Sequence, residues 1–168
     1  SYHPWRISAA LLGNASARNA ISGPWCDMDI TAGAGGTITY ATSGVAPNRR
    51  FTATWCTMPM YNSSFCPGQV TTTQIILYET CNLIDVHVNS KTICAAWNNG
   101  RAIIGVQNAA GTNAVVAPLR DFTPPFVCTN EAWRFTPSGA TYTVAPIPYH
   151  PVPNSASAVN WFNGATLV

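Results

Sequence analysis

Charge is what this sequence lacks most. Only 8% of its 168 residues are charged, against roughly 25% in an average soluble domain, and Lys91 is the only lysine. The net charge of +2 is too small for the basic surface that nucleic-acid binding requires. We therefore expect no nucleic-acid partner. The polar surface must come from Thr, Ser, Asn and Gln, as is common in extracellular β-rich proteins.

Long apolar runs are also missing. None approaches the roughly 18 residues that a membrane-spanning helix needs, so we expect no membrane insertion. The opening stretch SYHPWRISAALLG lacks the charged start and the long apolar core of a signal peptide. If the protein is secreted and works outside the cell or at its surface, as the composition suggests, we expect this sequence to be a mature form or an excised piece.

Groups that could carry catalysis are few. The chain has six carboxylates and three histidines, and it contains no G-x-S-x-G, H-E-x-x-H or glycine-rich phosphate loop. Two carboxylates are enough for glycoside hydrolysis, but nothing in the sequence pairs them. The histidines do not cluster as a metal site would require. We expect no enzymatic activity and no cofactor.

Asp27 and Asp29 are the one weak indication of a metal. They alternate before a flexible glycine-rich turn, and acidic side chains spaced in this way can bind Ca²⁺ through oxygen. A calcium site needs six or more oxygen ligands, and no third acid follows. The interpretation we favour is a turn in which the two aspartates cap backbone N–H groups.

The cysteines indicate an oxidising compartment. No pair has C-x-x-C spacing, which argues against zinc and thioredoxin-type sites. An even number at wide spacing is typical of disulfides; the alternative is six buried thiols in a cytosolic protein. We predict Cys56–Cys66, which would close one short loop between strands. By elimination, the other two pairs are Cys81–Cys128 and Cys26–Cys94.

Apolar and polar residues alternate along most of the chain, which predicts strands. In the segment 82–88, Ile84, Val86 and Val88 are expected to point inward, and Asp85 and His87 toward water. Gly105 predicts a bulge or a close approach of another backbone. Glu131 and Arg134 lie on opposite faces of one strand, so we expect a partner on a neighbouring element. The predicted strands are 36–42, 49–57, 72–79, 82–88, 101–107, 113–117, 131–137 and 141–146.

Short strands separated by Gly/Asn turns predict an all-β fold, an antiparallel, jelly-roll-like β-sandwich. At most one short helix is expected, near residues 8–21. We place the sandwich domain at 1–146. Prolines at 146, 148, 151 and 153 then predict an extended linker. The remainder, 147–168, combines this linker with a terminal strand that packs on another domain or subunit.

Some aromatic residues are candidates for a binding surface. Trp55 and Trp133 lie in alternating strands and are expected in the core. Trp5, Trp97 and Trp161 lie near the ends of the chain or in turns, where a tryptophan can serve binding or assembly.

Four segments resemble a β-sandwich module of large secreted surface proteins of Bacteroidota. Those proteins are known as gliding-motility-associated or type IX secretion cargo, with tandem Ig-like or PKD-like domains. The module is also distantly similar to the extracellular nidogen-type (NIDO) domain. In that family a few strands precede the point where this chain begins, so the resemblance implies that 1–146 lacks its first strands. The four segments are NAISGPWCDMDITAGAGGTITYATSGVAPNRRFTATW, TTTQIILYETCNLIDVHV, WNNGRAIIGVQNAAGT and TNEAWRFTPSG.

Two functions from different classes follow. The first is an extracellular structural or adhesive module, a subunit of a surface fibre or of a repeat-containing adhesin. It would assemble with itself or with neighbouring domains through strand contacts, because Val159, Trp161 and Phe162 follow the linker with nothing of their own to pack on. The second is a carbohydrate-binding module that stacks exposed Trp and Tyr on glycans.

Overall fold

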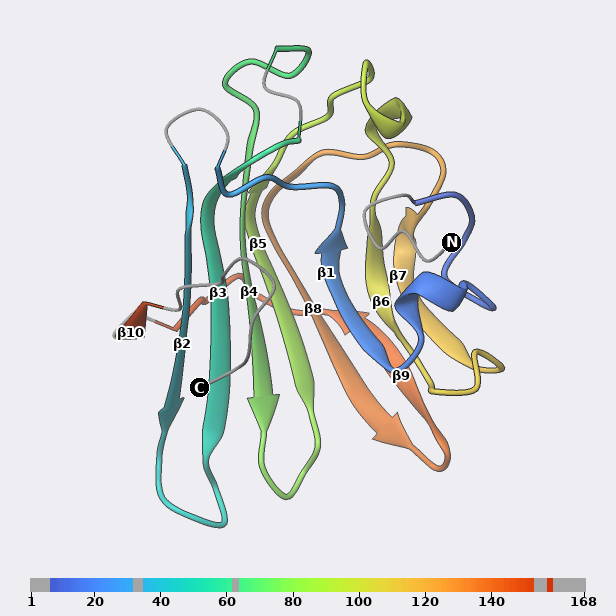
Figure 1. Ribbon diagram of the computed structural model, residues 1–168. Coiled ribbons are helices and arrows are strands. Elements are labelled where there is room, and N and C mark those ends of the chain that lie inside the picture. The colour runs from blue at the N-terminus through green and yellow to red at the C-terminus, as the bar shows by residue number, and fades with distance from the viewer. Residues whose placement is uncertain (1–6, 32–34, 62–63, 153–156, 159–168) are drawn as a thin grey trace.

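A computed structural model describes residues 7–31, 35–61, 64–152 and 157–158. Two antiparallel β-sheets pack face to face (Figure 1), which confirms the predicted all-β sandwich. The smaller sheet has the order β1-β6-β7 and the larger one β10-β2-β3-β4-β5-β8-β9. The strands are β1 Ala20–Trp25, β2 Thr37–Ser43, β3 Arg50–Pro59, β4 Val70–Tyr78, β5 Ile84–Lys91, β6 Ile103–Gln107, β7 Ala114–Asp121, β8 Cys128–Ser138, β9 Thr141–Pro146 and β10 Ser157–Ala158.

The first strand was not among those predicted, and the segment before it was expected to contain at most one short helix. In the segment 8–21, the described helical structure is a single 3₁₀ turn, Ala15–Ala17, in which the Ser16 N–H donates to the side chain of Asn14. The chain then enters β1, and Gly23 explains why. A Cβ at Gly23 would lie 2.8 Å from Val86 and 3.2 Å from Ile75, so only glycine lets β1 pack this closely on the larger sheet.

The core lies between the two sheets. One row of inward residues crosses the larger sheet, with Ile75 opposite Val86 and Val86 opposite Trp133. From the smaller sheet, Ile103 and Ile104 are fully buried. Burial of such side chains is the main favourable contribution to folding.

Gly105 in β6 marks a close approach, as predicted. A Cβ there would lie 2.7 Å from Leu11 Cδ2 and 2.7 Å from the Val115 carbonyl oxygen. The register of β6 against β7 also shifts at this point. The β7 strand continues through Pro118 to Asp121, beyond the predicted 113–117.

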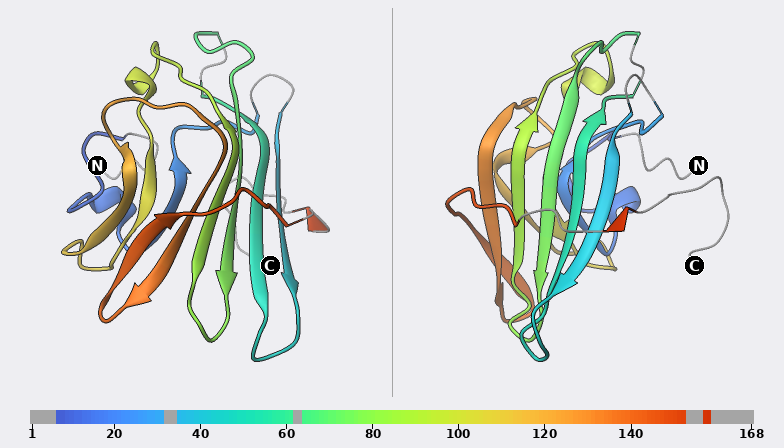
Figure 2. Two further views of the ribbon diagram at one scale, coloured as in Figure 1. Left: turned by 180° about the vertical axis from the view of Figure 1, so that it is seen from behind. Right: turned by 90° about the vertical axis from the view of Figure 1, so that its left-hand side faces the viewer.

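The outer face of the larger sheet corrects a prediction. Asp85 and His87 do point away from the core, but only 1% and 3% of their surface is exposed. The segment 147–152 crosses this face and covers it (Figure 2). Gln74 fixes the segment, because its amide donates to the Val152 carbonyl at 3.0 Å and accepts from the Val152 N–H at 2.8 Å. We call residues 147–152 the strap.

His87 is enclosed beneath the strap. Its ring meets Tyr149 edge-on at 5.8 Å, and Nδ1 has no hydrogen-bond partner among the described residues. Burial lowers its pKa; Asp85 opposes this shift, and the positive groups Arg134 and His150 add to it. His87 is therefore a neutral imidazole at neutral pH.

Glu131 and Arg134 both find partners on neighbouring strands, where a partner for one of them was predicted. Arg134 donates to Asp85 on β5 through Nε and Nη2, each at 2.7 Å, and the Tyr78 hydroxyl donates to the same carboxylate at 2.8 Å. Glu131 accepts from Arg120 of β7 at 2.8 and 2.7 Å. The second pair joins the two sheets.

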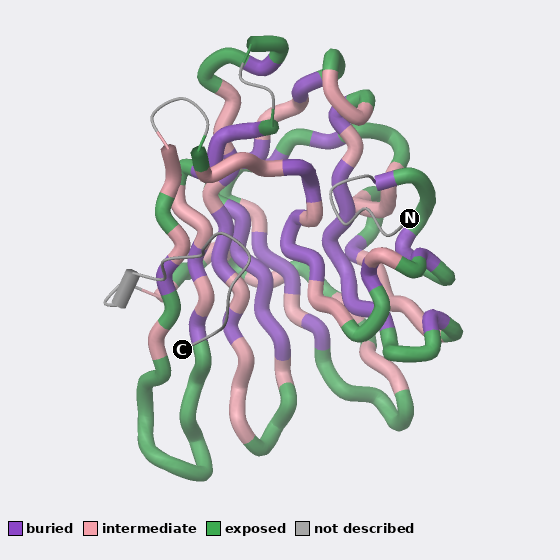
Figure 3. The backbone as a smooth tube through the Cα atoms, viewed as in Figure 1, coloured by how far each residue is buried: buried purple, intermediate pink, exposed green. Residues whose placement is uncertain are grey.

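The sandwich is closed on one side and open on the other. On the closed side, β7 lies beside β9, and the Thr141 hydroxyl donates to Asn113 at 3.2 Å. On the open side, the inner face of β2 and β3 extends past the smaller sheet. Tyr40 and Phe51 lie there with ring centres 6.0 Å apart, and they are 47% and 39% exposed. Figure 3 shows this side of the larger sheet as largely exposed or half-buried.

Candidate functional site

The β2 strand forms an edge with little protection. Its sequence, TITYATS, contains no charge and no proline, which are the usual devices that keep a sheet edge from pairing with another chain. Among the described residues, its outer partner is β10, which matches only two positions: Ser157 opposite Tyr40 and Ala158 opposite Thr39. Most of the β2 edge therefore has no strand beside it in the described part of the chain.

The strap connects the end of β9 to the segment that pairs with this edge. It runs from the end of β9 across the outer face, is fixed at Gln74, and leads to β10 beside β2 (Figure 2). A tail beyond a proline-rich linker is thus guided to a sheet edge. The predicted docking residues Val159, Trp161 and Phe162, and Trp5, lie outside the described residues.

Trp97 is the predicted surface aromatic that the structure describes. It is half-buried, its ring lies 4.8 Å from that of Tyr61, and its indole N–H donates to Asp27 at 2.8 Å. Tyr61 and Phe65 on the facing loop are 41% and 63% exposed. These loops form one end of the sandwich and present a fixed aromatic pair to solvent.

The two candidate calcium ligands have other partners. Asp27 accepts from Trp97, and burial raises its pKa. Asp29 accepts from the backbone N–H of Thr31 at 2.9 Å and from its hydroxyl at 2.6 Å, the turn-capping role that we favour. No group of three metal-binding side chains occurs within the ranges that the structure describes.

The disulfide differs from the predicted pairing. Cys66 is bonded to Cys94, which joins the loop after β3 to the loop after β5. The predicted pairs Cys56–Cys66 and Cys26–Cys94 are therefore wrong. Cys81 and Cys128 are free as well, along with Cys26 and Cys56. Cys81 lies in the β4–β5 hairpin, whereas Cys128 stands opposite Lys91 at the other end of β5.

Each of the six carboxylates is held by the protein itself. Asp121 accepts from the Leu11 N–H at 2.8 Å, and Glu79 forms an exposed pair with Arg49 that lowers the pKa of Glu79 to about 2. The other four are Asp27, Asp29, Asp85 and Glu131, described above. A catalytic carboxylate must face its substrate. In this arrangement each one supports a loop or a strand.

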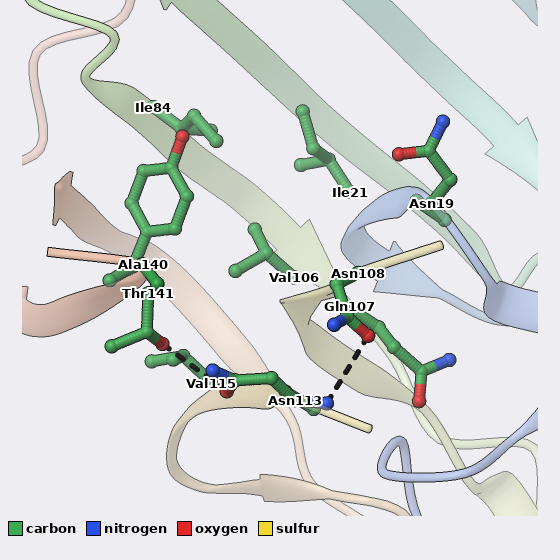
Figure 4. A pocket seen from close by; sticks show the side chains of 13 residues that line it. Asn19, Ile21, Ile84, Val106, Gln107, Asn108, Asn113, Val115, Ala140 and Thr141 are labelled. Atoms are coloured by element: carbon green, nitrogen blue, oxygen red, sulfur yellow. Dashed lines mark hydrogen bonds between the residues drawn. The ribbon is translucent and has the colours of Figure 1, made fainter. Parts of the chain in front are cut away.

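A pocket of about 300 Å³ lies at the other end of the sandwich (Figure 4). Its polar groups are mostly amides already in use: Gln107 accepts from the Gly13 N–H at 2.7 Å and donates to the Asn14 carbonyl at 2.8 Å. Its lining contains no carboxylate, histidine or cysteine. Sequence reasoning missed it, although two Asn-rich turns border it. Its lining is Asn19, Ala20, Ile21, Ile84, Val106, Gln107, Asn108, Asn113, Ala114, Val115, Ala140, Thr141 and Tyr142.

Comparison with known proteins gives one match. The family model described as NIDO related matches residues 5–146, whereas no curated protein and no solved structure matches the chain. Among the described residues, no helix is long and apolar enough to cross a membrane. The match covers most of the sequence, and it confirms the NIDO-like part of the resemblance. The chain belongs to the NIDO-related family.

Proposed function

We propose that this protein is an extracellular structural or adhesive module that assembles through strand contacts at the β2 edge. The observation that carries the proposal is the pairing of β10 with an otherwise open β2. Two paired residues add little stability, so the same edge can accept a longer strand from another chain. Strand addition to an open edge is a common mode of recognition.

Three features support an extracellular, structural role. The family match is to NIDO-related domains, the Cys66–Cys94 disulfide suits an oxidising compartment, and all six carboxylates serve the fold. The resemblance of the sequence to fibre subunits and adhesins of Bacteroidota is part of the same proposal. In its more specific form, the protein is a gliding-motility-associated cargo of type IX secretion. The partners are then further copies, or neighbouring domains of one surface protein.

The mechanism is an exchange between copies. When the tail of one copy leaves its own β2, the same residues can pair with β2 of a second copy. The hydrogen bonds are equivalent in both arrangements, and the proline-rich linker sets how far the tail reaches. Tyr40 and Phe51, exposed on the adjoining inner face, offer apolar surface to the incoming segment.

The test compares three chains by light scattering and negative-stain electron microscopy. The full chain is expected to form oligomers or filaments, and a chain without residues 154–168 is expected to stay monomeric. A matched control keeps the length and replaces Val159, Trp161 and Phe162 by Ser; it should also be monomeric. A monomeric full chain, or unchanged assembly after the deletion, overturns the proposal.

Carbohydrate binding is the second candidate, favoured by the Tyr61–Trp97 pair. An aromatic pair fixed by a buried aspartate offers a surface on which a sugar ring can stack. Titration with a glycan panel should shift the tryptophan fluorescence of the chain, and Tyr61→Ala should reduce the shift. If no glycan changes the emission, this function is excluded for that panel.

A further inference from the structure

Lys91, the only lysine of the chain, is buried at the end of β5. Only 1% of its surface is exposed. On β4 its register partner is Thr71, and on β8 it is Cys128. Partners directly opposite in antiparallel strands place their side chains on one face, with Cβ atoms about 5 Å apart. This row of three, all at most 3% exposed, faces the core.

Among the residues that the structure describes, no carboxylate pairs with the Lys91 ammonium. Its Nζ donates to the carbonyls of Thr92 and Phe126, each at 2.9 Å, and lies 4.9 Å from the centre of the Phe126 ring. All six carboxylates are described, and none forms an ion pair with it. Burial lowers the pKa of Lys91, so the neutral, nucleophilic amine is more accessible here than on the surface.

Two free thiols lie near enough to Lys91 to influence its charge. Cys26 follows β1 and Cys128 begins β8; both are buried in the core. Burial raises the pKa of each, to about 12 for Cys128, and the charge of Lys91 lowers both. The Thr71 hydroxyl is close enough to Cys26 to lower its pKa as well, yet no described group meets it in hydrogen-bond geometry.

As a purely structural group, Lys91 is costly. Its two hydrogen bonds to carbonyls stabilise the loop before β8, but the charge is buried without a counter-ion, and a neutral side chain of similar shape would avoid that penalty. The cluster also contains two free thiols, those of Cys26 and Cys128, although Cys66 and Cys94 of the same chain are oxidised to a disulfide. A covalent bond at the amine would remove both the charge and one thiol.

We propose that Lys91 Nζ and Cys128 Sγ become joined through one oxygen atom, with dioxygen as the oxidant. The balance is R–NH₂ + R′–SH + O₂ → R–NH–O–S–R′ + H₂O. Nitrogen and sulfur each lose two electrons, dioxygen takes four, and one oxygen atom leaves as water with two of the three hydrogens. Cys128 is the partner because it stands opposite Lys91 and because Nζ already bonds to Phe126, two residues before it.

The bridge fits its surroundings. Its oxygen is an acceptor that the Thr71 hydroxyl, without a partner at present, can meet by a rotation of its side chain. The product ties β5 to β8 at the position where Lys91 and Cys128 stand opposite each other. The inference stands independently of the proposed function, since it concerns only the core of one chain.

The test is peptide mapping by mass spectrometry on the wild-type chain, purified in air without reductant. Thiols are first blocked with iodoacetamide in denaturant, and chymotryptic peptides are then mapped. Chymotrypsin leaves Lys91 and Cys94 in one peptide, and Cys94 is bonded to Cys66. We expect this disulfide-linked pair of peptides to carry the Cys128 peptide as well, at a mass above the pair plus that peptide by one oxygen less two hydrogens. Dithiothreitol should abolish it. Alkylated Cys128 with unmodified Lys91, or a Cys26–Cys128 disulfide, overturns the proposal.

Two variants show which groups are needed. Lys91→Met keeps the apolar stem and removes the amine, so the added oxygen should disappear completely. Cys26→Ala should retain it. A cross-link that survives Lys91→Met, or one that Cys26→Ala abolishes in a folded chain, contradicts the assignment. If either variant fails to fold, the wild-type peptide map decides alone.

Discussion

The Asp85–Arg134 pair on the outer face allows a sharp prediction, because its two members differ in exposure. The Asp85 side chain is 2% exposed, whereas that of Arg134 is 38% exposed. Removing the arginine leaves the Asp85 carboxylate buried without its ion-pair partner. Removing the aspartate leaves the Arg134 guanidinium, which water can reach. We therefore expect Arg134→Ala to be the more damaging of the two substitutions.

The magnitudes follow from what is left behind. After Arg134→Ala, the Asp85 carboxylate keeps only the Tyr78 hydroxyl, and breaking a buried pair in this way costs about 3–5 kcal/mol. After Asp85→Ala, Arg134 rehydrates and the cost falls to about 1–2 kcal/mol. The double variant leaves no buried charge at this pair and should resemble Asp85→Ala. Asp85→Ala is thus expected to rescue Arg134→Ala by about 2 kcal/mol.

Urea denaturation followed by tryptophan fluorescence measures these free energies, with equal slopes as the check that the states compared are the same. Tyr78→Phe is the matched control, since it removes one hydrogen bond and should cost about 1 kcal/mol. If Asp85→Ala destabilises the protein more than Arg134→Ala does, exposure is not what decides the energetics of this pair, and the reasoning fails.

Three further predictions concern His87, the disulfide and Gly105. The His87 pKa is held below 6.5, so the unfolded chain takes its proton first; lowering the pH from about 7.5 to about 5.5 should lower Tm, and His87→Phe should flatten that dependence. Replacing Cys66 and Cys94 by Ala opens a link across 28 residues and should cost about 3–4 kcal/mol in urea denaturation. Gly105→Ala puts a methyl 2.7 Å from Leu11 and from a β7 carbonyl; an unfolding free energy reduced by about 1–3 kcal/mol is expected, and an unchanged one contradicts the packing.

Strands whose residues alternate could be predicted from sequence, because alternation records which face meets the core. This worked for β2, β3, β4, β5, β8 and β9 to within a few residues. It failed for β1, since Gly23 and Pro24 interrupt the pattern at its centre. The β1 strand depends on the close packing of Gly23 against Ile75 and Val86. These residues are distant in sequence, so local sequence patterns do not predict the contact.

The candidate site was less accessible to prediction. The polar face of β5 could be identified from its alternating residues. The strap that buries Asp85 and His87 could not, because the local sequence does not indicate which surface a proline-rich segment will pack on. The Cys66–Cys94 pairing likewise depends on which loops share one end of the sandwich. Trp97 could be placed in a turn, whereas its bond to Asp27 spans distant parts of the chain.

The order of attachments along the C-terminal segment has a mechanical consequence. A force applied at the C-terminus would first peel the two paired residues of β10 from β2, then open the two hydrogen bonds at Gln74, and only afterwards load the β8–β9 hairpin. These steps release residues 147–158, the 12 residues that follow Pro146, or about 40 Å of extended chain. The segment would lengthen under tension while the sandwich and its disulfide remain intact. It would dock again on the sheet when the force is removed.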